Sequence, residues 1–365
     1  MNQTKIKTFT LLNLGGPRNE NEIEKFLLDL FLDPYVFDLP LWEPIRKLLA
    51  IFIAKTRTKK VKKTYASMGY GGGSPLFDET NKQLIGIKEV LDQMTGDNWS
   101  GNILMACGAP NIKDFVNKSN KPNKDNIHLA LYPQFSRSTV LSTASIYQSL
   151  TGVCPMSNEG WIEPFGLDSR FINITSQFIY DYFTNNLNEM DYPHFDSPNS
   201  ILNWQNVDLV FSAHGIPMRL IDKGDMYVIQ LNEMIENILT KLRSLGFYGS
   251  HHLSFQSRVG RAKWTEPNTK DVLRELGGKR KNIVVYPISF VGDHLETLEE
   301  IGVELKEIAL KAGAGSYHRI PALGIYPPFI EFLAKLILES HEGKVYNVCL
   351  CKKYGGEKLA GCHLD

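Results

Sequence analysis

The sequence predicts an α/β protein with two similar doubly wound (Rossmann-like) parallel-sheet domains facing a central cleft. Short apolar runs alternate with longer segments of helical periodicity, which is typical of βαβ units. The two halves also repeat their landmarks. A strand, a glycine and a proline occur together in T-L-L-N-L-G-G-P and again in L-V-F-S-A-H-G-I-P. A strand, Tyr-Pro and a serine recur in L-A-L-Y-P-Q-F-S and V-V-V-Y-P-I-S-F.

Each element is expected from its own local pattern. Apolar or β-branched runs that end at Gly or Pro predict strands, and apolar residues three and four apart between capping residues predict helices. The expected strands are residues 5–14, 102–105, 127–131, 209–211, 252–256 and 282–285. The expected helices are residues 20–32, 80–94, 138–150, 168–189, 226–245, 269–276, 293–310 and 328–339.

The chain of 365 residues is long enough for two domains. We expect an N-terminal domain over residues 1–195 and a C-terminal domain over residues 196–345, followed by a cysteine-containing tail over residues 346–365. The boundary is placed by a stretch rich in Pro, Ser and Asn near residue 195. The final helix, 328–339, could pack back on the N-terminal domain.

Composition excludes several classes. Lys and Arg together number 40, as do Asp and Glu, so the formal net charge is zero and nothing indicates a nucleic-acid partner. No apolar run reaches the roughly 18 residues of a membrane span, and no secretory leader is visible. We therefore expect a cytoplasmic protein. The apolar segment 35–54 leaves peripheral contact with the inner membrane open.

His214 is the first candidate for chemistry. It stands where a buried strand ends and the chain turns, in S-A-H-G-I-P. Ligands of open α/β sheets bind at this carboxyl edge. A neutral imidazole can ligate a metal ion or accept a proton near neutral pH. A histidine with a purely structural role at a turn is the alternative.

A line of acidic residues is the second candidate. Asp293, Glu296, Glu300 and Glu304 are spaced three, four and four apart, which places them along one face of a helix. A solvated face explains such a run equally well. However, the helix follows a strand that ends in Tyr-Pro, so Glu296 could face His214 across the cleft. One imidazole and one carboxylate suit a transiently held divalent ion such as Fe²⁺.

The glycine loop 69–75 lacks the Lys-Ser/Thr that ends a phosphate-binding loop. Its backbone amides, with Ser74, could instead hold a carboxylate, and Arg57 could do so through a bidentate pair. A flexible turn is the alternative.

Five cysteines is an odd count for a disulfide framework, and the chain is not a short secreted one. Four thiolates could hold a [2Fe–2S] cluster or zinc. The candidates for this set are Cys154, Cys349, Cys351 and Cys362. Cys107, which follows a strand, is expected to be a small buried hydrophobic residue.

Several motifs resemble those of one family, in order from about residue 11 to residue 301. They are L-N-L-G-G-P, F-L-D-P, I-A-K-T-R-T, G-G-G-S-P, Y-P-Q-F-S, S-A-H-G-I-P, Q-S-R-V-G, W-T-E-P-N-T and P-I-S-F-V-G-D-H-L-E-T-L-E-E-I. The chain is similar to the ferrochelatases. The resemblance implies insertion of Fe²⁺ into a porphyrin, with protoporphyrin IX favoured and two protons released, and with no nucleotide cofactor.

The resemblance also implies roles for individual residues. His214 and Glu296 match the catalytic, metal-handling pair. Segment 35–54 matches an apolar lip that covers the porphyrin. The matched porphyrin contacts are Arg57, Tyr65 and Ser74; the matched acidic relay is Asp293, Glu300 and Glu304; and the four cysteines Cys154, Cys349, Cys351 and Cys362 are similar to those of cluster-bearing members.

One departure from the family pattern leaves alternatives open. The family usually has Met-Arg-Tyr before a proline on the middle strand of the first domain, whereas this chain has Met105, Ala106 and Cys107. The expected cation and phenol are missing. A chelatase that inserts cobalt or nickel into another tetrapyrrole, or a non-catalytic porphyrin or haem carrier, therefore remains an alternative. The sequence allows a monomer or a homodimer.

Overall fold

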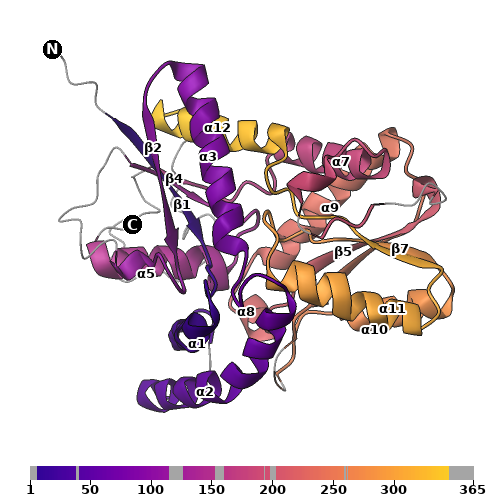
Figure 1. Ribbon diagram of the computed structural model, residues 1–365, viewed down its shortest axis with the longest axis horizontal. Helices are drawn as coiled ribbons and strands as arrows, with labels where there is room; N and C mark the ends of the chain where they lie inside the picture. The colour runs from indigo at the N-terminus through magenta and orange to yellow at the C-terminus, as the bar shows by residue number, and fades with distance from the viewer. Residues whose placement is uncertain are drawn as a thin grey trace. The chain divides into compact units, whose positions relative to one another are not determined.

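The chain forms two compact units in the computed structural model (Figure 1). The structure describes residues 6–37, 41–114, 126–152, 160–192, 194–197, 203–258, 260 and 262–344. Unit 1 comprises the chain up to Pro164 and again from Ile330 onward, and unit 2 is Phe165–Phe329. The boundary falls before residue 195 because helix α7 (Ser169–Phe183) packs against helix α9 (Tyr227–Ser244) and so belongs to unit 2.

Unit 1 is a parallel sheet with helices packed around it. Helix α3 lies against strands β1 and β2, and α1 packs on α2. Its elements are β1 (Lys7–Asn13), the 3₁₀ turn η1 (Glu20–Glu22), α1 (Ile23–Leu32), α2 (Glu43–Ser67), α3 (Leu76–Thr95), β2 (Trp99–Met105), β3 (Asn126–Ala130), the short π-helix η2 (Arg137–Leu141), α5 (Ser142–Thr151), β4 (Trp161–Ile162) and, from Ile330 onward, α12 (Pro327–His341).

Unit 2 is a second parallel sheet, with α7 and α9 on one face and α10 and α11 on the other (Figure 1). Besides α7 and α9, its elements are the 3₁₀ turns η3 (Glu189–Asp191) and η4 (Trp204–Asn206), β5 (Asp208–His214), α8 (Met218–Asp222), β6 (His251–Gln256), α10 (Thr269–Gly278), β7 (Asn282–Tyr286), the π-helix η5 (Glu296–Leu305), α11 (Lys306–Lys311) and β8 (Ser316–Arg319).

The two sheets share one topology, which confirms the predicted fold class of two similar α/β domains. Their strand orders are β2-β1-β3-β4 and β6-β5-β7-β8, and all pairs are parallel. In each sheet the first strand lies between the second and the third. Such a sheet leaves a switch point at the carboxyl end of its first strand, where ligands bind. In unit 2 this strand is β5, which ends at His214.

The last strand of each sheet, β4 in unit 1 and β8 in unit 2, was not predicted from the sequence. Strand β4 has two residues and β8 has four, S-Y-H-R. A strand of two residues, or one as polar as S-Y-H-R, carries too little of the apolar run that predicts a strand. The sequence also suggested an apolar segment followed by basic residues, which the structure joins into the single 25-residue helix α2.

The long helix expected at residues 293–310 is a π-helix for most of its length. Residues Glu296–Leu305 are π-helical, and the α-helix α11 follows directly. Within this π-helix, the carbonyl of Ile301 accepts a hydrogen bond from the Tyr317 hydroxyl at 2.6 Å. Ile301 and Leu305 face a core with Val210, Val285 and other buried residues of unit 2. A π-helical turn is rare and is often found at functional sites.

The segment before the π-helix is fixed by a buried ion pair. Arg319 Nη1 on β8 lies 2.9 Å from Asp293 Oδ1, and both side chains are 2 % exposed. The backbone N–H of Ala322 also donates to Asp293 Oδ1, at 3.4 Å. The pair therefore ties the start of the π-helix region to the edge strand of the sheet.

None of the helices within the described ranges combines the length and the apolar character that crossing a membrane requires.

Removal of the buried pair should destabilise unit 2. Asp293→Ala leaves the Arg319 guanidinium buried without its counter-charge, and we expect a loss of about 3–5 kcal/mol in the free energy of unfolding. Urea denaturation followed by circular dichroism measures it. Glu307→Ala is the control, because Glu307 pairs with Lys311 on the exposed surface and its removal should leave the unfolding midpoint unchanged. Equal effects of the two substitutions would contradict the anchoring role.

Candidate active site

His214 is the last residue of β5 and is half-buried at the carboxyl edge of the sheet. It pairs in register with Gln256, the last residue of β6, and the N–H of the next residue, Gly215, donates to the Gln256 carbonyl at 2.9 Å. The ring of Phe290 stands edge-on to the imidazole, with 6.2 Å between centroids. The turn that follows β5 therefore holds the imidazole at the ligand-binding edge.

Glu296 and His294 form a close pair at the same edge. His294 Nε2 lies 2.8 Å from Glu296 Oε2. Phe290 also packs against His294, with 4.4 Å between ring centroids, so this ring touches both histidines. Both His294 and Glu296 come from the segment that follows β7, the strand next to β5. The expected proximity of His214 and Glu296 therefore arises within unit 2 rather than across a cleft between domains.

Burial and charge set the protonation of this group. Burial lowers the pKa of His214 below its ordinary value, and the charge of Glu296 opposes this only in part. Burial acts in the same direction on His294, but the charge and the hydrogen bond of Glu296 raise its pKa overall. For Glu296, burial favours the protonated form, yet the two histidines outweigh it and lower the pKa to about 2. At neutral pH, His214 is thus a free base beside a permanent carboxylate.

The predicted acidic line is present only in part. Glu300 interacts electrostatically with both Glu296 and Glu304, so these three side chains lie near one another along the π-helix. Asp293 precedes the helix and forms the buried pair with Arg319 instead. The contacts therefore give Asp293 an anchoring position and not a place in the line.

Glu300 and Glu304 already have partners. Glu300 accepts hydrogen bonds from the N–H of Ser257, at 2.9 Å, and from the Ser257 hydroxyl. Burial raises the pKa of Glu300, the bonds from Ser257 lower it, and the charges of Glu296 and Glu304 raise it again, for a net rise. Glu304 Oε1 lies 2.5 Å from Lys270 Nζ on α10. Glu300 is therefore easier to protonate than an ordinary glutamate.

The glycine loop of unit 1 packs tightly on the turn after β1. The N–H of Ser74 donates to the Pro17 carbonyl at 2.7 Å. A Cβ on Gly73 would lie 2.3 Å from the Arg18 carbonyl oxygen, and a Cβ on Gly16 would lie 2.7 Å from the Ser74 Cβ. Only glycine allows this approach. The Ser74 hydroxyl also accepts from the N–H of Leu76, the first residue of helix α3, at 3.3 Å.

Arg57 and Tyr65 differ in their access to solvent. Arg57 is half-buried on α2, with its guanidinium carbon 5.8 Å from the centroid of the Phe31 ring. It makes no ion pair within the part of the chain that the structure describes. Tyr65 lies further along α2 and is only 3 % exposed. Arg57 therefore offers an uncommitted cation, whereas Tyr65 faces the interior of unit 1.

The cysteines of the predicted cluster, Cys154, Cys349, Cys351 and Cys362, lie outside the described residues. Cys107 is described and is 1 % exposed, and burial raises the pKa of its thiol. This confirms the expectation of a small buried hydrophobic residue. Across the described ranges, no three His, Cys, Asp or Glu side chains gather as a set of metal ligands.

Two residues of the candidate site were not singled out from the sequence. His294 was not paired with Glu296, because residues two apart do not face each other on a helix. The π-helix begins at Glu296, however, so His294 lies before it and can reach back to the carboxylate. Phe290, in the P-I-S-F that ends the β7 repeat, was treated as a landmark of the repeat alone.

Comparison with known proteins agrees with this geometry. A sequence profile described as ferrochelatase matches residues 7–341. A ferrochelatase of Leptospira borgpetersenii is 55 % identical over 347 residues, which is 95 % of this chain and 94 % of the relative. One of Leptospira biflexa is 51 % identical over 358 residues, 98 % of each chain. Ferrochelatase-1 of Arabidopsis thaliana is 35 % identical over 343 residues, 90 % of this chain and 68 % of the relative.

The fold, the imidazole–carboxylate site and these matches define a metal chelatase, an enzyme of the lyase class. Within that class, the chain belongs to the ferrochelatase family. The reaction of the family is the insertion of Fe²⁺ into a porphyrin, so iron is a substrate here. The assignment favours this reaction over the cobalt or nickel chelatase that the sequence had left open.

Removal of the Glu296 charge should shift both histidines. Since a nearby negative charge stabilises the imidazolium, Glu296→Gln should lower the pKa of His294 and lower that of His214 further. NMR titration of the histidine ring protons measures both values. Glu299→Gln removes a charge from the same helix, where its charged neighbours are Glu304 and Glu307, and should leave both unchanged. Unshifted histidines in Glu296→Gln would refute the pairing.

Proposed function

We propose that His214 accepts the pyrrole protons and, with Glu296, holds the Fe²⁺ ion as it enters the porphyrin, with protoporphyrin IX as the favoured substrate. The observation that carries this proposal is the position of the His214 imidazole at the carboxyl end of β5, near the His294–Glu296 pair. Burial lowers the pKa of His214, which favours its neutral form. A neutral imidazole can ligate Fe²⁺ or take a proton, and an imidazolium can do neither. His294 orients the carboxylate through its 2.8 Å contact with Glu296.

Metal insertion releases two protons, and the acidic line supplies groups to receive them. Glu300 is the most suitable acceptor after His214, because burial and the charges of its neighbours raise its pKa. Both of its oxygens already accept hydrogen bonds from Ser257, which disfavours a role as a metal ligand. We therefore assign Glu300 to proton transfer. Glu304, paired with Lys270 nearer the surface, continues the line.

Unit 1 is proposed to bind the porphyrin. Arg57 has no acidic partner in the described part of the chain, and its guanidinium suits a porphyrin carboxylate. Ser74 is held by the glycine loop at the turn after β1 and is proposed to contact the same ligand. Tyr65 is buried, so its proposed contribution is to support α2 beneath the ligand rather than to offer its hydroxyl.

The lip, defined as segment 35–54, is proposed to cover the porphyrin and to touch a membrane surface peripherally. The part of α2 that belongs to it exposes an unusual amount of apolar surface: Trp42 is 74 % exposed, Leu48 68 % and Phe52 64 %. Exposed apolar patches of this kind mark ligand or membrane contacts. Lysines follow along the same helix, at positions where anionic lipid headgroups would attract them.

Substitution of His214 tests the central proposal. His214→Ala removes the proton acceptor, so anaerobic Fe²⁺ insertion should fall by at least about a hundredfold, while porphyrin binding, followed by fluorescence, persists. His251→Ala is the matched control, because His251 lies at the opposite end of the neighbouring strand β6. Full activity in His214→Ala would disprove the role. Turnover with protoporphyrin and coproporphyrin side by side identifies the porphyrin.

Glu300→Gln separates proton transfer from metal delivery. Glutamine keeps the shape and can still accept from Ser257, but it cannot take up a proton. We expect kcat to fall by at least about tenfold with the KM for Fe²⁺ unchanged. Glu299→Gln, on the same helix, should retain normal kinetics. A raised KM for Fe²⁺ with unchanged kcat would instead show that Glu300 delivers the metal.

A [2Fe–2S] cluster on Cys154, Cys349, Cys351 and Cys362 is also proposed, since four thiolates are the usual ligand set of such a cluster. Anaerobically purified protein should show iron–sulfur absorption and acid-labile sulfide. Cys154→Ser should lose both, and Cys107→Ser should keep both because Cys107 is buried in unit 1. Absence of sulfide in the unmodified protein would exclude the cluster.

A further inference from the structure

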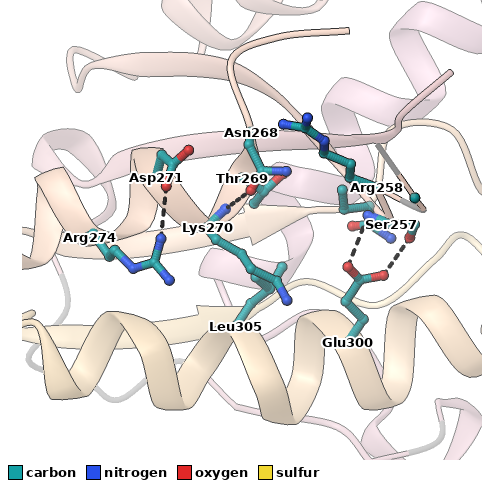
Figure 2. A pocket seen from close by; sticks show the side chains of 11 residues that line it. Ser257, Arg258, Asn268, Thr269, Lys270, Asp271, Arg274, Glu300 and Leu305 are labelled. Carbon is teal, nitrogen blue, oxygen red and sulfur yellow. Dashed lines mark hydrogen bonds and ion pairs between the residues drawn. The ribbon is translucent and has the colours of Figure 1, made fainter. Parts of the chain in front are cut away.

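A pocket lies within unit 2, beside the π-helix and apart from the His214–Glu296 pair (Figure 2). Its volume is about 360 Å³. The end of β6, the first turns of α10 and the π-helix η5 form its walls. Gln256, the register partner of His214 and the last residue of β6, is one of its lining residues, so the pocket also belongs to the carboxyl edge of the sheet.

The Gln256 side chain is 2 % exposed and has one unsatisfied donor. Its Oε1 accepts a hydrogen bond from the Ser212 hydroxyl at 2.6 Å. Its Nε2 has no hydrogen-bond partner within the described residues. A buried amide donor without a partner costs free energy, so its presence beside a cavity points to a ligand that accepts hydrogen bonds.

The other polar groups of the pocket also offer more donors than acceptors. Arg258 makes no hydrogen bond or ion pair in the described part of the chain. Asn268 Oδ1 is taken up by the N–H of Lys270 at 2.9 Å, which leaves its amide donors. The acceptors are already engaged: Glu300 accepts twice from Ser257, and Asp271 pairs with Arg274 at 2.8 Å, as Figure 2 shows.

The charges of the lining residues also favour a ligand that accepts hydrogen bonds and carries negative charge. Three cationic side chains line the pocket against two acidic ones: Arg258, Lys270 and Arg274 against Asp271 and Glu300. Lys270 is matched by Glu304, Arg274 by Asp271, and Glu300 is held by neutral donors. Arg258 is therefore the cation of the lining that forms no ion pair in the described part of the chain.

The backbone at the mouth of the pocket is also special. Ser257 has a φ of +64°, a left-handed conformation that is uncommon for a residue other than glycine. This conformation turns its N–H and its hydroxyl together toward Glu300. Such backbone outliers cluster at ligand-binding and catalytic sites.

We propose that this pocket binds a small oxyanion, with Arg258 and the Gln256 amide as its principal donors. The shared chemistry is that of a phosphate or a carboxylate group, both of which accept hydrogen bonds and carry negative charge. Glu300, proposed above for proton transfer, also lines the pocket, but neither His214 nor Glu296 does, so the proposal does not depend on the roles of those two residues.

Binding is tested with the full chain, without iron or porphyrin. Inorganic phosphate is titrated at constant ionic strength, and heat release or ³¹P line broadening follows the complex. We expect saturable binding that Arg258→Ala weakens by about tenfold, the effect of one lost charge-assisted contact. Arg258 is exposed, so this variant should fold normally. Arg243→Ala, an exposed arginine on α9, is the control for loss of charge alone.

A second variant tests the buried donor. Gln256→Glu keeps the acceptor for Ser212 but replaces the amide donor by a carboxylate, and should abolish phosphate binding; circular dichroism verifies its fold. Equal affinity in all variants, an equal loss in Arg258→Ala and Arg243→Ala, or no saturable binding in the unmodified chain would overturn the proposal. Competition by acetate or citrate identifies a carboxylate ligand, and its absence identifies phosphate.

Discussion

The charge on Glu296 is the constraint on which the site of unit 2 depends. A carboxylate in a half-buried position keeps its charge only if opposite or hydrogen-bonding groups face it, and His294 does so at 2.8 Å. The pair forms only because the π-helix starts at Glu296. Its start is in turn held by the buried contact of Asp293 with Arg319, and its middle by the bond from Tyr317. The edge strand β8 therefore fixes a side chain at the centre of the sheet edge.

The two units show how one scaffold carries different chemistry. Beyond the strand landmarks, P-N-I-K at 110–113 and P-N-T-K at 267–270 follow β2 and β6. Each proline carbonyl accepts from a strand N–H, at 2.8 and 2.9 Å, and each asparagine accepts from the N–H two residues later, at 2.9 Å in both units. In the repeat of the first strand and its Gly-X-Pro turn, L-G-G-P of unit 1 has Leu14 where H-G-I-P of unit 2 has His214. The backbone is thus repeated, and the residue proposed for metal and proton chemistry stands at the end of one of the repeated strands.

The sequence predicted the parts of the fold that local patterns determine. The two similar parallel-sheet domains follow from apolar strands and their repeated Gly-Pro and Tyr-Pro ends, and the place of His214 follows from such an end. The sequence did not predict contacts between residues far apart in the chain. The spacing of Asp293 and Glu296 matches a helix face, but Asp293 forms an ion pair with Arg319 instead. Arg319 lies on β8, a strand too short to be recognised from the sequence. The contact of His294 with Glu296 was not predicted, because the helical spacing was applied to a helix that begins before His294. Both errors come from treating residues 293–310 as one regular helix.

The Arg-Tyr pair that the family usually has is replaced by Ala106 and Cys107, and the backbone at these two positions is hydrogen-bonded. Ala106 and Cys107 continue the β1–β2 pairing, with their N–H groups donating to the carbonyls of Asn13 and Leu14 at 2.9 and 2.8 Å. Both side chains are almost wholly buried, and burial keeps the Cys107 thiol protonated by raising its pKa. They supply neither a cation nor an exposed phenol. Under the proposed roles, His214, Glu296 and Glu300 supply the proton and metal chemistry, and all three belong to β5 and the π-helix of unit 2. Arg57 of unit 1 is proposed as the cation for porphyrin binding, so in this proposal the missing pair would affect contacts to the porphyrin and not the groups of the metal step.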